Sequence, residues 1–247
     1  MKTKPRVRAV CESSIGLVRE NNEDRFLADG NHLVYCVADG MGGGEQGEKA
    51  SGLVCAEIAM LLRQQPEDFR ARMEAICTAV VCANEAILDY ARAMAFSQMG
   101  TTLSLLVFDP AVRSRAAVCH VGDSRVYRFR GGAVMPLTSD HTVAAEISRR
   151  RGAGVTPDRA NPLAHILTRA IGVTAAVCPD WRLVSVEPRD RFLICSDGVH
   201  DVIADDRLSE LVSGGTPDEA KGRLVREVLA FGAPDNFTFI ILDVADV

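Results

Sequence analysis

Apolar and polar residues alternate in two short runs near the start of the chain. These runs lie between Val7 and Val37 and are separated by Asp29-Gly30-Asn31, a sequence typical of a turn. Apolar residues then recur at helical spacing over Glu45 to Leu62 and again over Phe69 to Ala95, with Pro66 between the two segments. The pattern therefore predicts paired strands followed by two long amphipathic helices.

Strand-like patterns return after Gly100. Apolar runs bounded by Asp, Gly and Pro predict strands at 102–108, 116–121, 126–129, 181–186, 191–195 and 237–244. Helical spacing predicts helices at 206–211 and 217–229. Strands, paired helices, strands, helices and a last strand indicate a layered α+β protein. No repeat or linker-like tract divides it, so we expect a single domain over residues 1–247.

Residues 140–172 interrupt this order with a mixture of charged, Gly and Pro residues. Arg149, Arg150 and Arg151 are consecutive here, and Pro157 and Pro162 follow. Such a composition is more typical of an exposed, partly helical segment than of a core element, so we expect a flap. We interpret the three arginines as a solvated helix face.

Composition excludes several classes of protein. With a net charge of −5, the chain lacks the broad basic surface by which nucleic-acid binders neutralise phosphates. Most of the eight cysteines lie in apolar runs without CxxC pairs, which predicts buried, reduced thiols. No apolar stretch approaches the roughly 20 residues that cross a bilayer, and the first residues lack a signal core. We therefore expect a cytoplasmic protein without a membrane segment.

Aspartates recur where strand-like runs end. Four have Gly or a small polar neighbour and one is less regular: Asp39-Gly40, Gly122-Asp123, Asp197-Gly198, Asp235-Asn236 and Glu23-Asp24. Taken singly, an Asp-Gly pair is better explained as a simple turn. Together, carboxylates at strand ends can converge at one sheet edge, where divalent cations find oxygen ligands.

Eight blocks of sequence, in order, match one known family. They are 16–24 (GLVRENNED), 37–43 (VADGMGG) with Gly47-Glu48, 99–102 (MGTT), 121–125 (VGDSR), 137–141 (LTSDH), 167–172 (LTRAIG), 195–198 (CSDG) and 235–238 (DNFT). From about Ser14 to Asp243 the chain resembles the PPM, or PP2C-type, protein phosphatases in their compact bacterial form. The resemblance implies a four-layer α-β-β-α sandwich with a central metal site.

The same resemblance implies a set of metal ligands. Asp39 would bridge two Mn²⁺ or Mg²⁺ ions, and Asp197 and Asp235 would complete the first site. The Gly40 carbonyl would bind the second ion, and Asp123 with Asp197 would hold a third. Paired ions of this kind activate a water for attack on a phosphoester.

Three further residues acquire roles from the resemblance. Glu23 and Asp24 match an acidic pair that acts near the second ion, in part through waters. Arg19 matches the arginine that binds the substrate phosphate, a role that suits a planar guanidinium. The family's general-acid histidines have no counterpart here, because Met41 and Gly44 stand in their places.

Two other matched blocks are expected to be structural. His141 follows Asp140 at the base of the flap, where we expect a hydrogen-bonded loop histidine. Thr101 and Thr102 are expected to satisfy local backbone groups at the start of a core strand. His32, His120, His165 and His200 receive no role from the sequence.

The implied function is hydrolysis of phosphoserine and phosphothreonine on proteins, opposing a bacterial Hanks-type kinase, by a monomer. Two alternatives stay open. The substrate could be a dedicated regulator such as an anti-sigma-factor antagonist. The chain could also be an inactive scaffold or metal-responsive binding module, although retention of Asp39, Asp197 and Asp235 argues against this.

Overall fold

Two antiparallel sheets form the centre of the molecule. The computed structural model describes residues 7–64, 68–112, 114–151 and 161–245. The first sheet has the order β1 (Val7–Ser14), β11 (Phe237–Val244), β10 (Arg191–Cys195), β7 (Arg125–Arg130), β8 (Ala133–Pro136). The second has the order β2 (Asp24–Asp29), β3 (Val34–Met41), β5 (Leu103–Phe108), β6 (Arg115–Val121), β9 (Asp180–Ser185), with β4 (Gly100–Thr101) beside β3.

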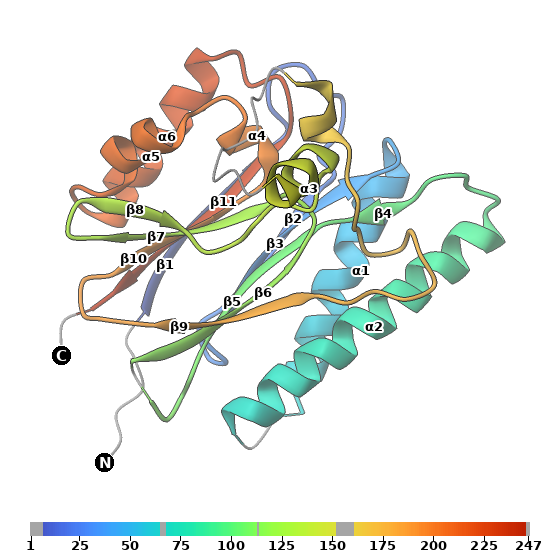
Figure 1. Cartoon of the computed structure of the whole chain (residues 1–247), viewed down its shortest axis with the longest axis horizontal. Helices are drawn as coiled ribbons and strands as arrows, with labels where there is room; N and C mark the ends of the chain where they lie inside the picture. Colours follow the sequence, from blue (N-terminus) through green and yellow to red (C-terminus); the bar gives the residue numbers. More distant parts are fainter. Residues whose placement is uncertain (1–6, 65–67, 113, 152–160, 246–247) are drawn as a thin grey trace.

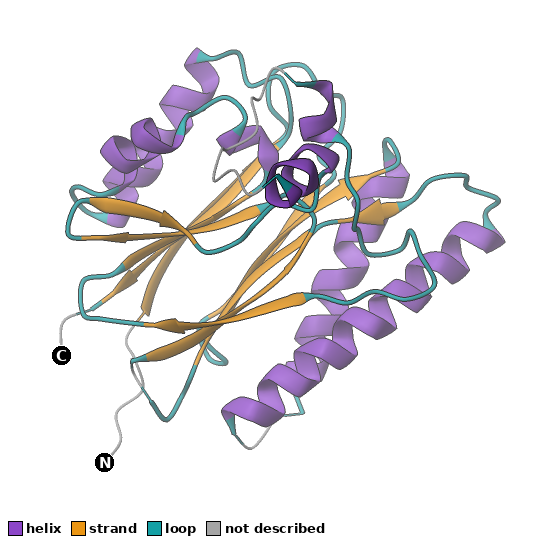
Figure 2. Cartoon of the chain, viewed as in Figure 1, coloured by secondary structure: helices purple, strands orange, loops and turns teal. Residues whose placement is uncertain are grey.

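Helices cover the outer face of each sheet (Figures 1 and 2). The second sheet packs against α1 (Glu45–Leu62) and α2 (Phe69–Ala93), whereas the first packs against α5 (Asp205–Val212) and α6 (Pro217–Ala230). A third apolar cluster joins the two sheets, with Phe108 and Phe192 in edge-to-face contact at 5.8 Å. This is the predicted α-β-β-α sandwich.

Strand β3 shows why these strands are apolar on both faces. Tyr35 and Val37 face the other sheet, while Val34 and Cys36 face the helices. Since side chains alternate along a strand, a strand covered on both sides must be apolar at successive positions. The predicted burial of cysteine is confirmed for Cys36 and others, and all eight thiols are free; Cys178, however, is exposed.

Most predicted elements are present, with shifted ends. The first run contains three strands rather than two, and the second helix ends at Ala93. Strand β8 and the one-turn helix α4 (Asp197–His200) were missed, because a strand and a helix of four residues each are too short to show a period. Pro66 lies outside the described residues.

The flap region contains two short helical segments. They are α3 (Val143–Arg150) and the 3₁₀ helix η1 (Pro162–His165), and residues 152–160 lie outside the description. Arg149, Arg150 and Arg151 are exposed at the end of α3, as predicted. In the described part of the chain, no helix is long and apolar enough to span a membrane.

Candidate functional site

The predicted aspartates gather at one edge of the sandwich. Asp39 lies near the end of β3, and Asp24 begins β2 directly opposite it in the strand register. Asp197 follows the end of β10, and Asp235 precedes the start of β11. Asp123 occupies the turn between β6 and β7. Antiparallel pairing thus brings five carboxylates, spread over more than 200 residues of sequence, to the same strand ends.

The backbone of Asp39 is held on both sides. Thr101 donates its hydroxyl to the Asp39 carbonyl at 2.8 Å. The Thr102 hydroxyl accepts from the Asp39 amide at 3.0 Å and contacts the Ser124 hydroxyl at 2.6 Å. The expectation that these threonines satisfy backbone groups is confirmed. Their contacts fix the strand end from which the Asp39 carboxylate projects.

Asp39 and Asp197 line the same cavity and influence each other's charge. Both side chains lie at the base of a cavity and retain some exposure, but protein surrounds them. Burial, together with the charges of Asp197, Asp24 and Asp123, raises the pKa of Asp39 well above its usual range. Burial and the neighbouring acids Asp201 and Asp235 also raise the pKa of Asp197. Mutual repulsion in a poorly solvated place produces both shifts.

Asp24 is more deeply buried. The Ser196 hydroxyl donates to its carboxylate at 2.7 Å. Burial and the charge of Asp197 raise the pKa of Asp24 to about 7, even though that hydrogen bond favours the charged form. The metal-free site therefore contains more carboxylates than it can stabilise as anions.

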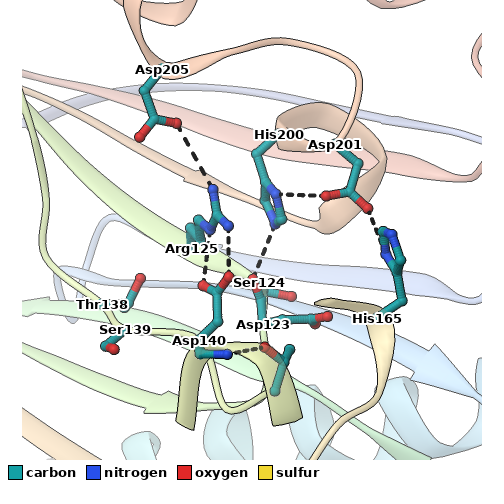
Figure 3. A network of polar contacts seen from close by, with 12 residues as sticks. Asp123, Ser124, Arg125, Thr138, Ser139, Asp140, His165, His200, Asp201 and Asp205 are labelled. Carbon is teal, nitrogen blue, oxygen red and sulfur yellow. Dashed lines mark hydrogen bonds and ion pairs between the residues drawn. The ribbon is translucent and has the colours of Figure 1, made fainter. Parts of the chain in front are cut away.

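Asp123 is positioned by a polar network in the first sheet and the flap base (Figure 3). Its backbone carbonyl accepts a hydrogen bond from His200 Nε2 at 3.1 Å. Next to it, Arg125 binds Asp140 through two hydrogen bonds of 2.9 and 2.6 Å. Burial, followed by the charge of Asp197, raises the pKa of the Asp123 carboxyl well above its usual range.

His141 has the structural role that the sequence predicts. Its Nδ1 accepts from the Gly122 amide at 3.1 Å, and its Nε2 lies 3.1 Å from Asp180. The side chain is fully buried. His141 therefore ties the turn that carries Asp123 to strand β9.

Glu23 is packed against the start of α1. Its carboxylate accepts from the Gly44 amide at 2.6 Å, where the helix dipole favours negative charge. Close packing requires glycine at two positions: a Cβ on Gly40 would collide with the Gly47 backbone, and one on Gly47 would collide with Glu23. These glycines allow the Gly40 backbone and the Glu23 carboxylate to lie together.

Arg19 is attached to the carboxylate cluster through Asp235. The two side chains form an ion pair of 2.6 Å, and the Arg19 side chain is 53% exposed. The adjacent Asn236 accepts from the Glu23 amide at 2.8 Å and donates to the carbonyls of Ile15 and Asn21 at 2.9 Å each. Asn236 thereby positions the loop that carries Arg19, a role that the sequence analysis did not assign.

A cavity of about 680 Å³ opens above the carboxylates. Asp39, Asp123 and Asp197 form its acidic end. The rest of the wall comes from Met41, the end of α2, and the flap residues, among them His165. The carboxylates and the flap residues therefore border the same cavity.

The residues fit divalent cations in their chemistry. In the described ranges, no group of three or more His, Cys, Asp or Glu side chains is already arranged to hold an ion. The donor set nevertheless consists of carboxylate oxygens and a backbone carbonyl, the hard ligands that Mn²⁺ and Mg²⁺ accept. The raised pKa values of Asp39 and Asp197 indicate that the site disfavours several carboxylate anions at once, and bound cations would remove this cost.

Comparison with known proteins agrees with this geometry. The family model of protein phosphatase 2C matches residues 18–217. Serine/threonine protein phosphatase PstP of Mycobacterium tuberculosis is 35% identical over 97% of this chain, and the match spans 45% of PstP. This chain thus corresponds to a little under half of that relative's length.

Two solved structures are similar over nearly their whole length. PppA, described as a key regulatory component of T6SS in Pseudomonas aeruginosa, has a TM-score of 0.86 and 32% identity, covering 98% of this chain and 99% of PppA. The catalytic domain of PstP in complex with two manganese ions has a TM-score of 0.83 and 35% identity, covering 97% and 99%.

Proposed function

Because this chain belongs to the protein phosphatase 2C family, we propose that it is a metal-dependent protein phosphatase acting on phosphoserine and phosphothreonine. The observation that carries the proposal is the convergence of Asp24, Asp39, Asp123 and Asp197 at one edge of the sandwich, where the last three line one cavity. Carboxyl groups gathered in this way repel one another unless a proton or a cation neutralises them, which supports a cation-binding role.

The proposed ligands are those that the resemblance implies. Asp39 would bridge two ions, Asp197 and Asp235 would complete one site, and Gly40 would complete the other through its carbonyl. When bound, Mn²⁺ or Mg²⁺ supplies the positive charge that acidifies a water and neutralises phosphate oxygens. Asp123 would hold a third ion together with Asp197.

The chain's own groups orient the reactants. The Arg19 guanidinium would bind phosphate oxygens, and its ion pair with Asp235 keeps it beside the carboxylates. Glu23 and Asp24 would hold waters around the second ion, each anchored by its contact to Gly44 or Ser196. Thr101 and Thr102 hold the Asp39 backbone in a fixed position while negative charge develops in the transition state.

The proposed substrates are phosphorylated proteins, with a Ser/Thr kinase of the Hanks type as the opposing enzyme. We also propose that the protein acts in the cytoplasm, where substrates of that kinase class would be found, and that it acts as a monomer. The named relatives are serine/threonine phosphatases, which supports this substrate class over a small phosphoester.

Hydrolysis of a phosphothreonine peptide with and without Mn²⁺ tests the proposal. We expect phosphate release by the wild type only with the metal, and loss of release in Asp197→Asn. A wild type that is folded and binds Mn²⁺ but releases no phosphate would contradict the proposal and favour the scaffold alternative.

A further inference from the structure

Hydrolysis of a serine or threonine phosphoester needs a proton at the leaving oxygen. An alkoxide is strongly basic, so its departure is slow unless an acid protonates it, and general acids typically contribute 10²–10⁴-fold. Met41 and Gly44 provide no acid at the positions where the family carries histidine. This inference rests on the proposed function and asks which residue supplies that proton.

Three of the five histidines are enclosed in the fold. His120 contacts the Ser104 hydroxyl at 3.0 Å, and His141 binds the Gly122 amide. His200 donates to the Asp123 carbonyl. All three side chains are buried, so a substrate cannot reach them.

His32 lies at the end of the sheet opposite the carboxylate cluster. It belongs to the turn between β2 and β3, and its Nδ1 is 2.6 Å from Asp29 Oδ2. Asp39 is seven positions further along the chain, most of them in the extended strand β3, which corresponds to roughly 20 Å. His32 therefore forms a histidine–aspartate pair that is remote from the carboxylate cluster.

His165 is the histidine in the cavity wall. It ends the 3₁₀ helix η1 of the flap, and its side chain is 51% exposed. The same cavity is lined by Asp39, Asp123 and Asp197. His165 therefore borders the same cavity as three of the proposed metal ligands.

Asp201 orients the His165 ring (Figure 3). Its Oδ2 lies 3.3 Å from His165 Nδ1, while Oδ1 lies 3.2 Å from His200 Nδ1. The Asp201 amide donates to the Asp197 carbonyl at 2.8 Å, which places this residue one helical turn after a proposed ligand. The flap histidine and the metal-site helix are thus joined through one carboxylate.

Asp201 is placed to fix the His165 ring by one of its two nitrogens. The Asp201 carboxylate lies on the Nδ1 side of the ring, so proton donation to a substrate would come from the other nitrogen, Nε2. A carboxylate at one ring nitrogen and a reacting group at the other is the arrangement that orients a histidine acting as general acid.

We propose that His165 is the proton donor to the leaving oxygen and that Asp201 is its positioning residue. As water attacks phosphorus, the bond from phosphorus to the seryl or threonyl oxygen breaks and its electron pair stays on that oxygen. The oxygen takes the Nε2 proton and leaves as the alcohol. The neutral ring then regains the proton that the attacking water released through solvent, so one water is consumed for each phosphate formed.

Leaving groups of graded basicity test this role. The Mn²⁺-loaded full chain is compared with His165→Asn on a series of substituted phenyl phosphates, from p-nitrophenyl phosphate to phenyl phosphate, and on a phosphothreonine peptide. These aryl esters have nearly the same shape, so their binding hardly differs. p-Nitrophenolate is weakly basic and leaves without being protonated. Phenolate is more basic and an alkoxide more basic still, so their departure depends increasingly on a proton donor.

We expect the loss in kcat to grow with leaving-group basicity. The variant should retain p-nitrophenyl phosphate hydrolysis within about 3-fold and lose on the order of 10²-fold on the peptide. His32→Asn, which removes the remote histidine–aspartate pair, is the matched control and should change neither rate. An equal loss on every ester, or none on the peptide, would overturn this inference while leaving the proposed function intact. If the wild type hydrolyses no ester with Mn²⁺, the result contradicts both the role of His165 and the proposed function.

Histidine ring signals provide a readout that is independent of turnover. In ¹⁵N spectra of the metal-free chain, we expect the His165 Nδ1 signal to report a proton shared with Asp201. Asp201→Asn should shift this signal and leave that of His32 unchanged. A His165 ring signal unaffected by Asp201→Asn would contradict the assigned positioning role.

Discussion

Strands β10 and β11 carry charged residues at both of their ends, and the two ends differ in how charge is balanced. At the end away from the carboxylate cluster, Arg191 and Asp243 face each other across the two strands. Arg191 donates to Asp243 at 2.7 Å and to the Gly215 carbonyl at 2.9 Å. Each buried charge there has an opposite charge or a carbonyl beside it.

At the other end of the same strands, Asp197 and Asp235 belong to a group of acids. Asp235 pairs with Arg19, but Asp39 and Asp197 repel each other. Both ends border cavities of similar size, about 660 Å³ near Arg191 and 680 Å³ near Asp197. Cavity size therefore does not distinguish the two ends, whereas unbalanced charge does, and it marks the end where we propose the active site.

Replacing one acid of the unbalanced end should separate activity from stability. Asp39→Asn should lower kcat by on the order of 10³-fold or more, because several kcal/mol of transition-state stabilisation depends on the ions it would hold. The free energy of unfolding of the metal-free variant should not fall, since the substitution removes repulsion. Kinetics and urea denaturation check the two outcomes. A destabilised Asp39→Asn protein would show that this end is balanced after all.

The opposite result is expected at the balanced end. Asp243→Asn leaves the buried Arg191 guanidinium without its anion and should lower the free energy of unfolding by about 3 kcal/mol. The kcat of the folded fraction should be unchanged. Asp218→Asn is the matched control, because its ion pair with Arg8 is exposed and should contribute less than about 1 kcal/mol. Equal effects of the two substitutions on stability would contradict the comparison.

The excess acid should also make metal-free stability depend on pH. Asp24 has a pKa of about 7 when folded and near 3.8 when unfolded, so between these values the folded chain holds a proton that the unfolded chain releases. The free energy of unfolding should therefore fall as pH rises from about 4 to 7, by up to about 4 kcal/mol from this group.

The difference between wild type and Asp24→Asn isolates this contribution from other titrating groups. We expect the variant's relative stability to increase across that pH range in the metal-free protein, and the increase to shrink when Mn²⁺ is added. A difference that is flat from pH 4 to 7 would show that the folded Asp24 carboxyl has an ordinary pKa.

The smallest effect is expected at the edge of the cluster. Arg19→Lys keeps the positive charge beside Asp235 but loses the planar guanidinium, so kcat/KM for a phosphopeptide should fall about 10-fold. Stability should be unchanged, because the ion pair is largely exposed. Arg8→Lys, a similarly exposed arginine at the other end of the sandwich, should leave kcat/KM unaltered.

The local pattern of the chain determined the elements and the identity of the acids. Helices α1 and α6 lie within a residue of their predicted bounds, because apolar spacing and a capping pair at Thr216 and Glu219 mark them. Asp39, Asp123 and Asp197 were identifiable because each ends an apolar run beside glycine. Their proposed roles came from resemblance, and the metal-ligand assignments remain predictions.

Only the tertiary structure decided which of these groups meet. Asn236 joins three loops through its side chain, yet nothing in its local sequence distinguishes it from a turn asparagine. His165 and Asp201 are 36 positions apart, in η1 of the flap and directly after helix α4, and no local period relates them. Sequence patterns report local conformation and burial, whereas contacts between distant segments depend on sheet register and loop packing. The carboxylate repulsion and the His165–Asp201 pair are therefore properties of the fold.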